Sequence, residues 1–592
     1  MTILHALNRL GERLQAQDKL PPFGFSNEKI GFCIGLNEDG SVAAIHDLRT
    51  LNRKKLVSRI LPVPQSIKRA SSVATNFLWD NTAYVLGVTN TDDGRLAKVH
   101  AAFTEKHLAV LDGNECPALT ALRNFLENWN PEKFLPPFWP EDMKGQNVVF
   151  ALESEHRTRF LHDYPEAKEI WEKIYAERLG KTSICLVSGK IAPVARLHPS
   201  IKGVWGAQSS GASIVSFNQD SFTSYGHDQG DNAPISDAVA ARYVGALNEY
   251  LKRDNGHCIQ IGDASTVFWA EADNAIAGDN DLIVAEKAFG GFWGDDLVPE
   301  IDEDKQAGEV GYILSRIRDG SKLKDFKPAL AEGVRFYVLG LAPNAARLSV
   351  RFYLEDDFGV IAARYQRFLD ETAILPGPRH AYPRFWQYLV ETAVLKKREN
   401  IAPNLAGEWM RAILTGTPYP LTLLSSILIR LRADGDVNAL RVAMMRAVLV
   451  RNFNLEKEAP VAFDPDNDNK GYLLGRLFAV YEKIQYAAQG GVNSTVKDKF
   501  YGAASAQPRK IFSILEKGSA NHLAKIRKIG RSEKYYTNIV SGIMDKMSPG
   551  DDPYPVALSS LEQALFGLGY YHQRNEFFKT SKNESVSEDV SQ

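Results

Sequence analysis

Seven basic residues and no acidic residue lie between Leu48 and Ala70, and a row of phosphate groups is the ligand that suits them. The whole chain is nearly neutral, with 70 Lys and Arg residues against 72 Asp and Glu residues, so composition does not explain this local excess. Lysine and arginine neutralise nucleic-acid phosphates and release their counterions. The segment therefore predicts phosphate binding, with a solvated basic loop as the alternative. The seven residues are Arg49, Arg53, Lys54, Lys55, Arg59, Lys68 and Arg69.

A second set of residues carries neutral hydrogen-bonding groups that suit the edges of bases. One part follows the basic segment, and the other lies in a Ser- and Gly-rich stretch at 209–232. Amides and hydroxyls contact base edges without a charge penalty, and a good bidentate contact discriminates by about 1–3 kcal/mol. A polar edge hairpin is the alternative for the second part. The candidates for reading a short DNA motif are Asn76, Asn81, Ser209, Ser210, Asn218, Gln229 and Asn232.

A third feature is a basic helical segment near the C-terminus. Between Lys497 and Lys534 there are ten Lys and Arg residues and three Asp and Glu residues, and ten minus three gives a local net charge of +7. A positive helical surface of this kind can act as an electrostatic track for a nucleic-acid strand. The phosphate-binding candidates in this segment are Lys525, Arg527, Lys528 and Arg531.

Motifs for catalysis or metal binding are weak in this chain. Residues 180–183 end like a phosphate-binding P-loop, but Tyr175 stands where that motif requires glycine. The pairs at 155–156 and 162–163 combine His with a carboxylate, yet they lack the HExxH spacing of a metalloprotease, so we interpret them as structural. We therefore predict no catalytic residue, no metal and no cofactor.

One enzymatic alternative remains open at this stage. Asp263 and Glu271 lie near a predicted strand, and an acidic run begins at Asp295. Carboxylates are the ligands that a catalytic Mg²⁺ requires. A metal-dependent nucleic-acid-processing enzyme is thus the second candidate function, although a solvated acidic loop also explains the run.

The elements that must position these residues change in type along the chain. Up to about Leu354, helical patterns alternate with short apolar runs typical of strands, at 30–36, 83–88, 148–152, 183–187 and 213–217. Two longer runs between Val334 and Leu354 predict a hairpin. From Phe358 onward the apolar residues follow a helical period of 3.6. The fold class predicted is α+β: a mixed α/β N-terminal body with antiparallel sheets, followed by an all-α C-terminal helical bundle.

Length and local composition predict several domains. A chain of 592 residues exceeds the size at which one core keeps growing. We predict an α+β nucleic-acid-recognition body at 1–355, a helical region at 356–463, a C-terminal helical bundle at 464–578 and a disordered tail at 579–592. Cys33 and Cys185 sit in apolar runs typical of buried reduced thiols, which favours a cytoplasmic location. No apolar stretch reaches the ~20 residues that span a bilayer, so no membrane contact is expected.

Three segments taken together resemble a known family. They are residues 76–87 (NFLWDNTAYVLG), residues 216–234 with Ser-Phe-Asn, Ser-Tyr-Gly and Asn-Ala-Pro, and residues 336–348 with Phe-Tyr and Pro-Asn-Ala-Ala-Arg-Leu. A further match lies at 471–478. The chain resembles the large subunit of the type I-C CRISPR Cascade surveillance complex, the Csd-one family. The combination is specific, whereas any single piece would be weak.

The resemblance implies a function that spacing alone does not indicate. Members of this family recognise the protospacer-adjacent motif (PAM) in target double-stranded DNA, help to open the strands and favour recruitment of a Cas-three-type helicase-nuclease. They hold CRISPR RNA through the complex, beside Cas-five-type and Cas-seven-type subunits, and are not expected to cut. A small subunit made from the C-terminal helical part would correspond to the region after Asp464. The resemblance also implies a prokaryotic source.

Overall fold

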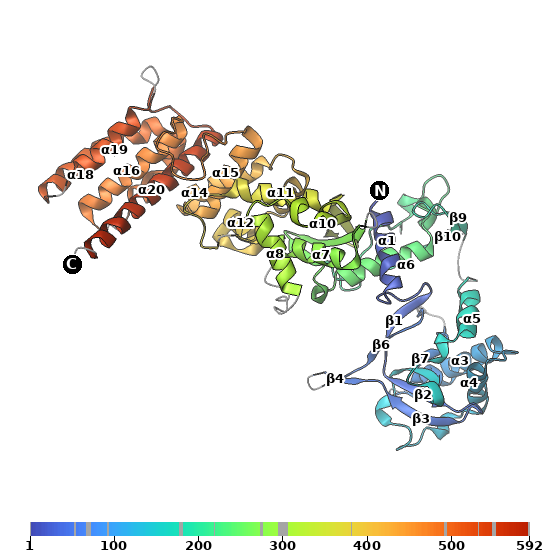
Figure 1. The fold of residues 1–592 in the computed structure, drawn as a ribbon. Coiled ribbons are helices and arrows are strands. Elements are labelled where there is room, and N and C mark those ends of the chain that lie inside the picture. Colours follow the sequence, from blue (N-terminus) through green and yellow to red (C-terminus); the bar gives the residue numbers. More distant parts are fainter. Residues whose placement is uncertain are drawn as a thin grey trace. The chain divides into compact units, whose positions relative to one another are not determined.

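The computed structural model describes residues 2–52, 55–66, 73–90, 94–176, 181–217, 219–272, 276–293, 306–380, 382–490, 494–530, 532–547 and 552–589. The chain divides into two compact units. Unit 1 comprises residues 1–200 and 215–247, and unit 2 comprises residues 201–214 and 248–592. Figure 1 shows the strand-rich unit 1 in blue to green and the helices of unit 2 from green to red.

Unit 1 is built around a four-stranded sheet with the order β3-β2-β8-β7. Strand β2 pairs in parallel with β8, and the other two pairings are antiparallel. Every residue of β2 is buried, because one apolar cluster covers Phe32, Ile34 and Leu36 while a second cluster covers Cys33 on the opposite face. The strands of the sheet are β2 (Phe32–Leu36), β3 (Val42–Asp47), β7 (Trp79–Asn81) and β8 (Asn147–Leu152).

Helices α2 and α4 of unit 1 pack against this sheet, whereas α1 and α6 pack against each other. Helix α4 begins with proline at its first turn and buries Leu119, Leu122 and Leu126 in the same core as Phe150 of β8. The helices are α1 (Ile3–Ala16), α2 (Thr82–Val85), α3 (Leu96–Val110), α4 (Pro117–Asn128), α5 (Pro165–Ala176) and α6 (Asp237–Tyr250).

Three two-stranded sheets complete the described part of unit 1. Strand β1 (Phe25–Ile30) pairs with β6 (Arg59–Pro64), and β9 (Thr182–Ile184) pairs with β10 (Ile191–Pro193). Strands β4 (Thr50–Asn52) and β5 (Lys55–Val57) form a hairpin within the basic segment. Leu51 and Leu56 are partners across this hairpin and are 73% and 53% exposed. Part of the basic segment therefore forms β-strands, and an apolar pair of side chains is exposed on them.

Two predicted strands of the N-terminal half are wrong. The run at 83–88 forms helix α2 instead, because the side chain of Asn81 accepts a hydrogen bond from the backbone N–H of Ala83 and starts a helix there. The run at 213–217 forms no strand. Ser213 makes one isolated bridge with Arg347, and the described residues after it are bends or irregular.

Unit 2 begins with an antiparallel sheet of order β11-β12-β13-β14. The predicted hairpin at 334–354 is present as β13 and β14, although both strands are longer than predicted and the chain reverses at Ala345 and Ala346. Phe336 and Val338 of β13 and Phe268 of β12 face the core that also takes in helix α7 (Asp279–Trp293). The strands are β11 (Cys258–Ile261), β12 (Ala264–Ala272), β13 (Val334–Asn344) and β14 (Arg347–Asp357).

After β14 the described residues form helices and their connections, as the sequence predicts. Helices α16 and α20 approach each other closely because glycines line their contact. A Cβ added at Gly475 would lie 2.0 Å from the carbonyl oxygen of Phe566, and one at Gly569 would lie 2.0 Å from that of Tyr472. The helices of unit 2 after α7 are α8 (Gln306–Arg318), α9 (Leu323–Phe326), α10 (Pro328–Glu332), α11 (Phe358–Thr372), α12 (Phe385–Thr392), α13 (Pro403–Thr415), α14 (Leu421–Asp434), α15 (Ala439–Phe453), α16 (Lys470–Gln489), α17 (Val496–Ala506), α18 (Pro508–Lys528), α19 (Lys534–Met544) and α20 (Ser560–Asp589).

The α+β fold class is confirmed, with antiparallel sheets in the N-terminal half and a helical C-terminal region. One apolar core runs through unit 2 from Ile259 to Phe577. Helix α20 continues to Asp589, across the stretch for which the sequence predicts a disordered tail. The division into four segments stays a prediction.

Candidate nucleic-acid interface

Helix α18 carries a stripe of four exposed lysines along one face. Its opposite face is buried through Phe512, Leu515 and Ile526, which fixes the orientation of the helix. Positions 7, 11, 15 and 18 residues apart return to the same side of an α-helix. The exposed residues on that side are Lys510, Ile514, Lys517, Asn521, Lys525 and Lys528. We call these six residues the α18 stripe.

The α18 stripe is suited to a nucleic-acid backbone. At 1.5 Å per residue it extends for about 27 Å, which allows contact with several successive phosphates. Burial and the charge of Lys525 lower the pKa of His522, so the imidazole beside the stripe is neutral and adds no positive charge of its own. Ile514 is 51% exposed between two of the lysines and offers an apolar surface to a base.

The four phosphate-binding candidates near the C-terminus do not share one environment. Lys525 and Lys528 belong to the α18 stripe. The guanidinium of Arg527 is exposed but paired with Glu533 through two hydrogen bonds, which raises its pKa. Arg531 lies outside the described residues. Lys510 and Lys517 are not among the residues predicted from the sequence, although the helical spacing of 510, 517 and 528 already places them on the same face as Lys528.

The basic segment in unit 1 is only partly available for phosphate binding. Arg49 is occupied: its guanidinium bonds to Asp47 and Asp142 and lies 4.4 Å from the ring centre of Phe32, and these carboxylates raise its pKa. Arg59 at the start of β6 is exposed. Lys55 lies in β5, but its side chain is outside the described part. Outside the described residues altogether are Arg53, Lys54, Lys68 and Arg69.

Two of the base-readout candidates are engaged within unit 1: Asn76 is buried and Asn81 is half-buried. Asn76 is 4% exposed, and its backbone N–H donates to the carboxylate of Asp80 at 2.9 Å. A base would reach Asn76 only after this segment rearranged. Asn81 uses both ends of its amide: Oδ1 caps α2, and Nδ2 donates to the carbonyl oxygen of Gly145 at 2.8 Å. These contacts give both residues a structural role in this conformation.

The remaining readout candidates are divided between the two units. Ser209 and Ser210 are exposed in a turn of unit 2. Gln229 and Asn232 belong to unit 1, where Gln229 Oε1 accepts from Arg196 and Asn232 Nδ2 donates to two backbone carbonyls. Asn218 lies outside the described residues. Base readout by any of these residues remains a prediction.

The two described carboxylates of the enzymatic alternative, Asp263 and Glu271, do not share one site. Asp263 precedes β12, where its Oδ2 accepts from Arg351 Nη2 at 2.5 Å. Glu271 is buried near the other end of β12, opposite Arg335. Eight residues of extended strand separate two such positions by about 26 Å, far beyond the reach of one metal ion. The acidic run from Asp295 lies outside the described residues.

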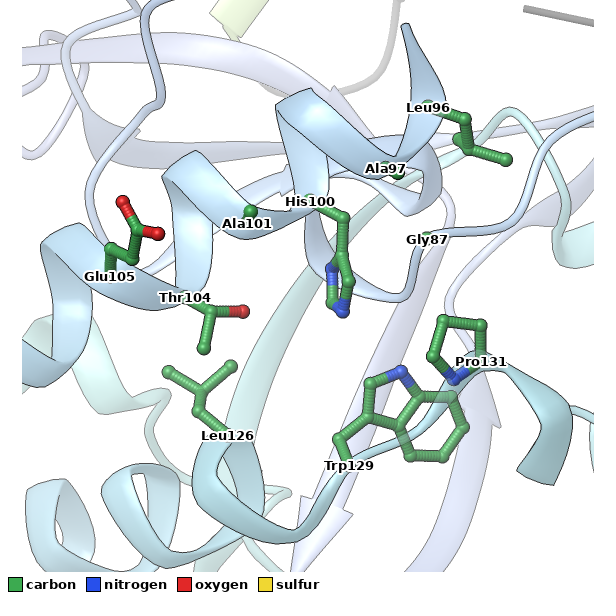
Figure 2. A pocket seen from close by; sticks show the side chains of 10 residues that line it. All are labelled: Gly87, Leu96, Ala97, His100, Ala101, Thr104, Glu105, Leu126, Trp129 and Pro131. Atoms are coloured by element: carbon green, nitrogen blue, oxygen red, sulfur yellow. The ribbon is translucent and has the colours of Figure 1, made fainter. Parts of the chain in front are cut away.

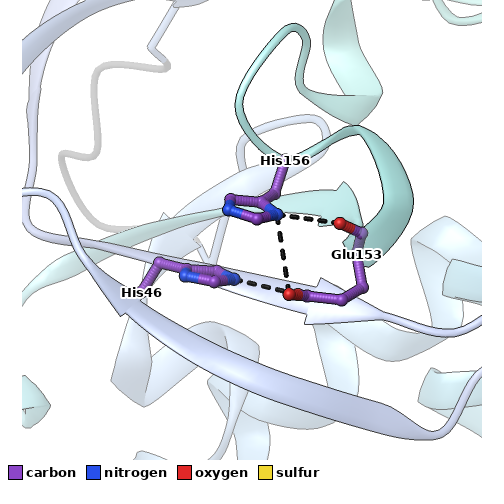
Figure 3. A group of neighbouring side chains, drawn as sticks. All are labelled: His46, Glu153 and His156. Carbon is purple, nitrogen blue, oxygen red and sulfur yellow. Dashed lines mark hydrogen bonds and ion pairs between the residues drawn. The ribbon is translucent and has the colours of Figure 1, made fainter.

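A cluster of two histidines and a glutamate links β3 to the segment after β8 (Figure 3). His46 Nε2 lies 2.9 Å from Glu153 Oε2, and His156 Nδ1 lies 2.8 Å from the backbone oxygen of Glu153. The two rings stack at 4.0 Å with an angle of 8°. A Cβ at Gly35 would lie 2.0 Å from Glu153 Oε2, so a side chain there would displace the carboxylate from its present position. Sequence spacing did not reveal this cluster, because His46 comes from a distant strand.

The geometry of this cluster favours hydrogen bonding over metal binding. A carbonyl oxygen only accepts, so His156 Nδ1 carries a proton. Parallel rings also direct their in-plane lone pairs side by side, whereas zinc requires nitrogen ligands that converge on one point. The neighbouring Glu155, considered from the sequence, pairs instead with Arg159 and Tyr164, which lower its pKa. His162 is buried, and burial lowers its pKa to about 4.

A cavity of about 430 Å³ lies between α3 and the chain that follows α4 (Figure 2). His100 Nδ1 bonds to the carbonyl oxygen of Tyr84, and Trp129 Nε1 donates to that of Leu86. With these polar groups turned to the backbone, the walls suit an apolar or aromatic group rather than a phosphate. The cavity is lined by Gly87, Leu96, Ala97, His100, Ala101, Thr104, Glu105, Leu126, Trp129 and Pro131.

The fold and the α18 stripe together define a class of protein: an α+β protein of two units, in which the helix-rich unit 2 exposes a stripe of lysines. Within the described residues, no helix combines the length and apolar character needed to cross a membrane. Residues 7–578 match the family described as CRISPR-associated protein (Cas_Csd1). The chain belongs to this family, and the resemblance stated from its sequence is confirmed at that level. Among curated proteins, none matches the chain.

Proposed function

We propose that this protein is the non-catalytic large subunit of a type I-C, RNA-guided antiviral surveillance complex. Its task is to bind target double-stranded DNA, recognise the protospacer-adjacent motif and promote strand opening and recruitment of a Cas-three-type helicase-nuclease. Family membership across residues 7–578 supports a CRISPR-associated role. Its partners are then CRISPR RNA held through the complex, Cas-five-type and Cas-seven-type subunits, and a small subunit from its own C-terminal region. The site of action is the prokaryotic cytoplasm.

The observation that carries the DNA-binding part of this proposal is the α18 stripe. Four lysines on one exposed helical face bind a backbone without regard to sequence. A strand displaced from a duplex needs such a track, since its sequence carries no further information once RNA–DNA pairing has read the target. We assign the displaced single strand to this stripe.

The basic segment of unit 1 supplies the second contact in this proposal. Arg59 is exposed beside the β4–β5 hairpin, and the apolar pair of Leu51 and Leu56 stands between basic positions. Phosphate contacts there set the affinity for duplex DNA. Motif discrimination falls to neutral residues, among which Ser209 and Ser210 are exposed in this conformation.

The test measures how DNA affinity depends on salt. The reconstituted complex is titrated with a fluorescent motif-bearing duplex at several salt concentrations, as wild type and with Lys510, Lys517, Lys525 and Lys528 changed to Gln. Each lost single-strand phosphate contact lowers the slope of log K against log salt by about 0.7. We expect the slope to fall by about 3, with weaker binding of all sequences and unchanged preference among motifs.

A charge-matched control separates this effect from net charge. Four exposed lysines elsewhere in unit 2, Lys322, Lys324, Lys397 and Lys457, are changed to Gln in the same background. This variant should keep the wild-type slope. Equal slopes in all three proteins would disprove the strand assignment, and cleavage of DNA by the isolated chain would disprove the non-catalytic role.

A further inference from the structure

The loop from Gln219 to Asp228 in unit 1, which we call the Tyr225 loop, presents one tyrosine at its tip. Tyr225 is 98% exposed and has a φ of +50°, and Gly226 follows with a φ of +75°. The backbone N–H of His227 donates to the carbonyl oxygen of Ser224 at 2.8 Å and closes the turn. Two successive left-handed residues define the tight turn that suits Asn, Asp or Gly at its first central position.

Tyrosine at this position carries a cost that the chain itself does not offset. A left-handed backbone costs an ordinary L-residue about 1–2 kcal/mol. Among the described residues, no hydrogen bond, ion pair or ring contact involves Tyr225. A Cβ added at Gly226 would also meet no described atom within 4 Å. A strained residue that presents a large ring to solvent indicates a contact with another molecule.

The base of the Tyr225 loop is fixed, so the ring is held ready for binding. Asn232 Nδ2 donates to the carbonyl oxygens of His227 at 3.1 Å and Gln229 at 3.0 Å. Gly230 sits directly on the preceding chain, since a Cβ there would lie 2.0 Å from the carbonyl oxygen of Ala195. A preorganised loop loses little conformational entropy when it binds.

The charges of the loop identify the chemistry of its partner. Asp220 and Asp228 are exposed, and residues 219–228 contain no lysine or arginine. Two exposed carboxylates on the same ten-residue loop as the tyrosine repel phosphate and attract a guanidinium, a group that pairs with acids and stacks on aromatic rings. Tyrosine and arginine are also the residues most enriched at the energetic centres of protein interfaces.

We propose that the Tyr225 loop docks on an arginine-bearing protein surface, with a guanidinium stacked on Tyr225 and held by Asp220 and Asp228. This inference rests on the proposed function in one respect: the surface belongs to a neighbouring subunit of the RNA-guided complex. It adds a protein-binding site that is separate in sequence from the DNA-binding candidates on α18 and the basic segment.

The experiment measures how tightly the full chain joins the remaining complex. A subcomplex of CRISPR RNA with the Cas-five-type and Cas-seven-type subunits is immobilised, and the chain is titrated as wild type, Tyr225→Asn and Tyr225→Phe. Asn suits the turn and removes the ring, so its melting temperature should equal or exceed that of wild type. We expect Tyr225→Asn to weaken binding about tenfold or more and Tyr225→Phe by less than about threefold.

Two further variants complete the design. Tyr486→Ala removes another exposed tyrosine, on helix α16, and should bind as wild type. Asp220→Lys combined with Asp228→Lys should weaken binding at least as much as Tyr225→Asn. Added salt should weaken the wild-type interaction, since opposite charges meet across it.

The outcomes distinguish this inference from the function on which it rests. If the wild-type chain and Tyr225→Asn bind the subcomplex equally well, the docking role of the loop is overturned and the proposed function is not. If Tyr225→Asn binds the subcomplex normally but binds protein-free CRISPR RNA more weakly, the docking role is also overturned, and Tyr225 contacts a base instead. Wild type that fails to join the subcomplex overturns the proposed function itself.

Discussion

His107 illustrates how a single buried residue makes unit 1 sensitive to acid. Its Nε2 accepts from the backbone N–H of Leu78 at 2.9 Å, and its Nδ1 bonds to the carbonyl oxygen of Phe103 at 2.8 Å. The acceptor role of Nε2 requires a neutral ring. Complete burial lowers the pKa of His107 from 6.5 to about 3. Leu78 has a φ of +61°, so this hydrogen bond also supports an unusual backbone conformation.

We predict that stability falls as pH falls from 6.5 towards 3, in part because of His107. The folded pKa lies below the unfolded one, so in this range the unfolded chain binds more protons and protonation favours unfolding. One such group contributes about 1.4 kcal/mol per pH unit. Urea unfolding of the full chain at pH 7, 6 and 5 measures this slope. His107→Gln should lower stability at pH 7 yet make the slope shallower, whereas the exposed His227→Gln should leave it unchanged; equal slopes in all three proteins would contradict the prediction.

At the scale of elements, the glycines between α16 and α20 set the distance between the two helices. We predict that Gly569→Ala lowers the free energy of unfolding by about 3 kcal/mol or more, because its Cβ would lie 2.0 Å from a backbone oxygen that cannot rotate away. Gly518→Ala is the matched control. Gly518 lies within α18 with no described atom within 4 Å of an added Cβ, so alanine should stabilise this helix by about 0.5–1 kcal/mol. Chemical denaturation of both variants checks the signs, and a neutral Gly569→Ala would show that the helices can separate without loss.

The same elements show how far sequence reasoning extends. Helical periodicity predicted α11, α14, α15 and α16, because a one-sided apolar face is a local property of the chain. It failed at 83–88, where the apolar run reads as a strand but the cap at Asn81 starts a helix. The side-chain amide of Asn81, predicted from the sequence to contact a base, is instead hydrogen-bonded to the backbone of Ala83 and Gly145. Only the fold shows which polar groups are already satisfied, and for that reason the sequence alone cannot tell a base-reading amide from a structural one.

Distant contacts limited the site prediction in the same way. In the cluster of His46, Glu153 and His156, His46 lies 107 positions before Glu153. No local sequence pattern predicts that these residues meet. The α18 stripe, in contrast, was within reach of the sequence. Its lysines follow one helical face. Lys510 and Lys517 were not predicted because the charges of the segment were summed without regard to their position around the helix.

At the scale of the whole molecule, the continuity of the core in unit 2 bears on the proposed small subunit. The region after Asp464 was predicted as a separate bundle, yet helix α20 also contacts earlier residues. Tyr571 donates its hydroxyl to the carbonyl oxygen of Pro376 at 2.6 Å, and a Cβ at Gly567 would lie 2.8 Å from the methyl group of Met445. Separation at 464 would expose the surface of α20 that α15 covers.

We therefore predict that a fragment of residues 464–589 is less stable than one of residues 358–589. The longer fragment keeps α11 to α15, including the hydrogen bond from Arg432 to Gln563. It also keeps the ion pairs of Arg441 with Glu391 and of Arg451 with Glu371. The shorter one exposes buried apolar surface, and each Å² of such surface costs about 25 cal/mol. Urea unfolding followed by circular dichroism should give a higher midpoint for the longer fragment. Equal midpoints would mean that α16–α20 form a self-sufficient bundle, in which case a small subunit could begin at Asp464 without a partner to cover α20.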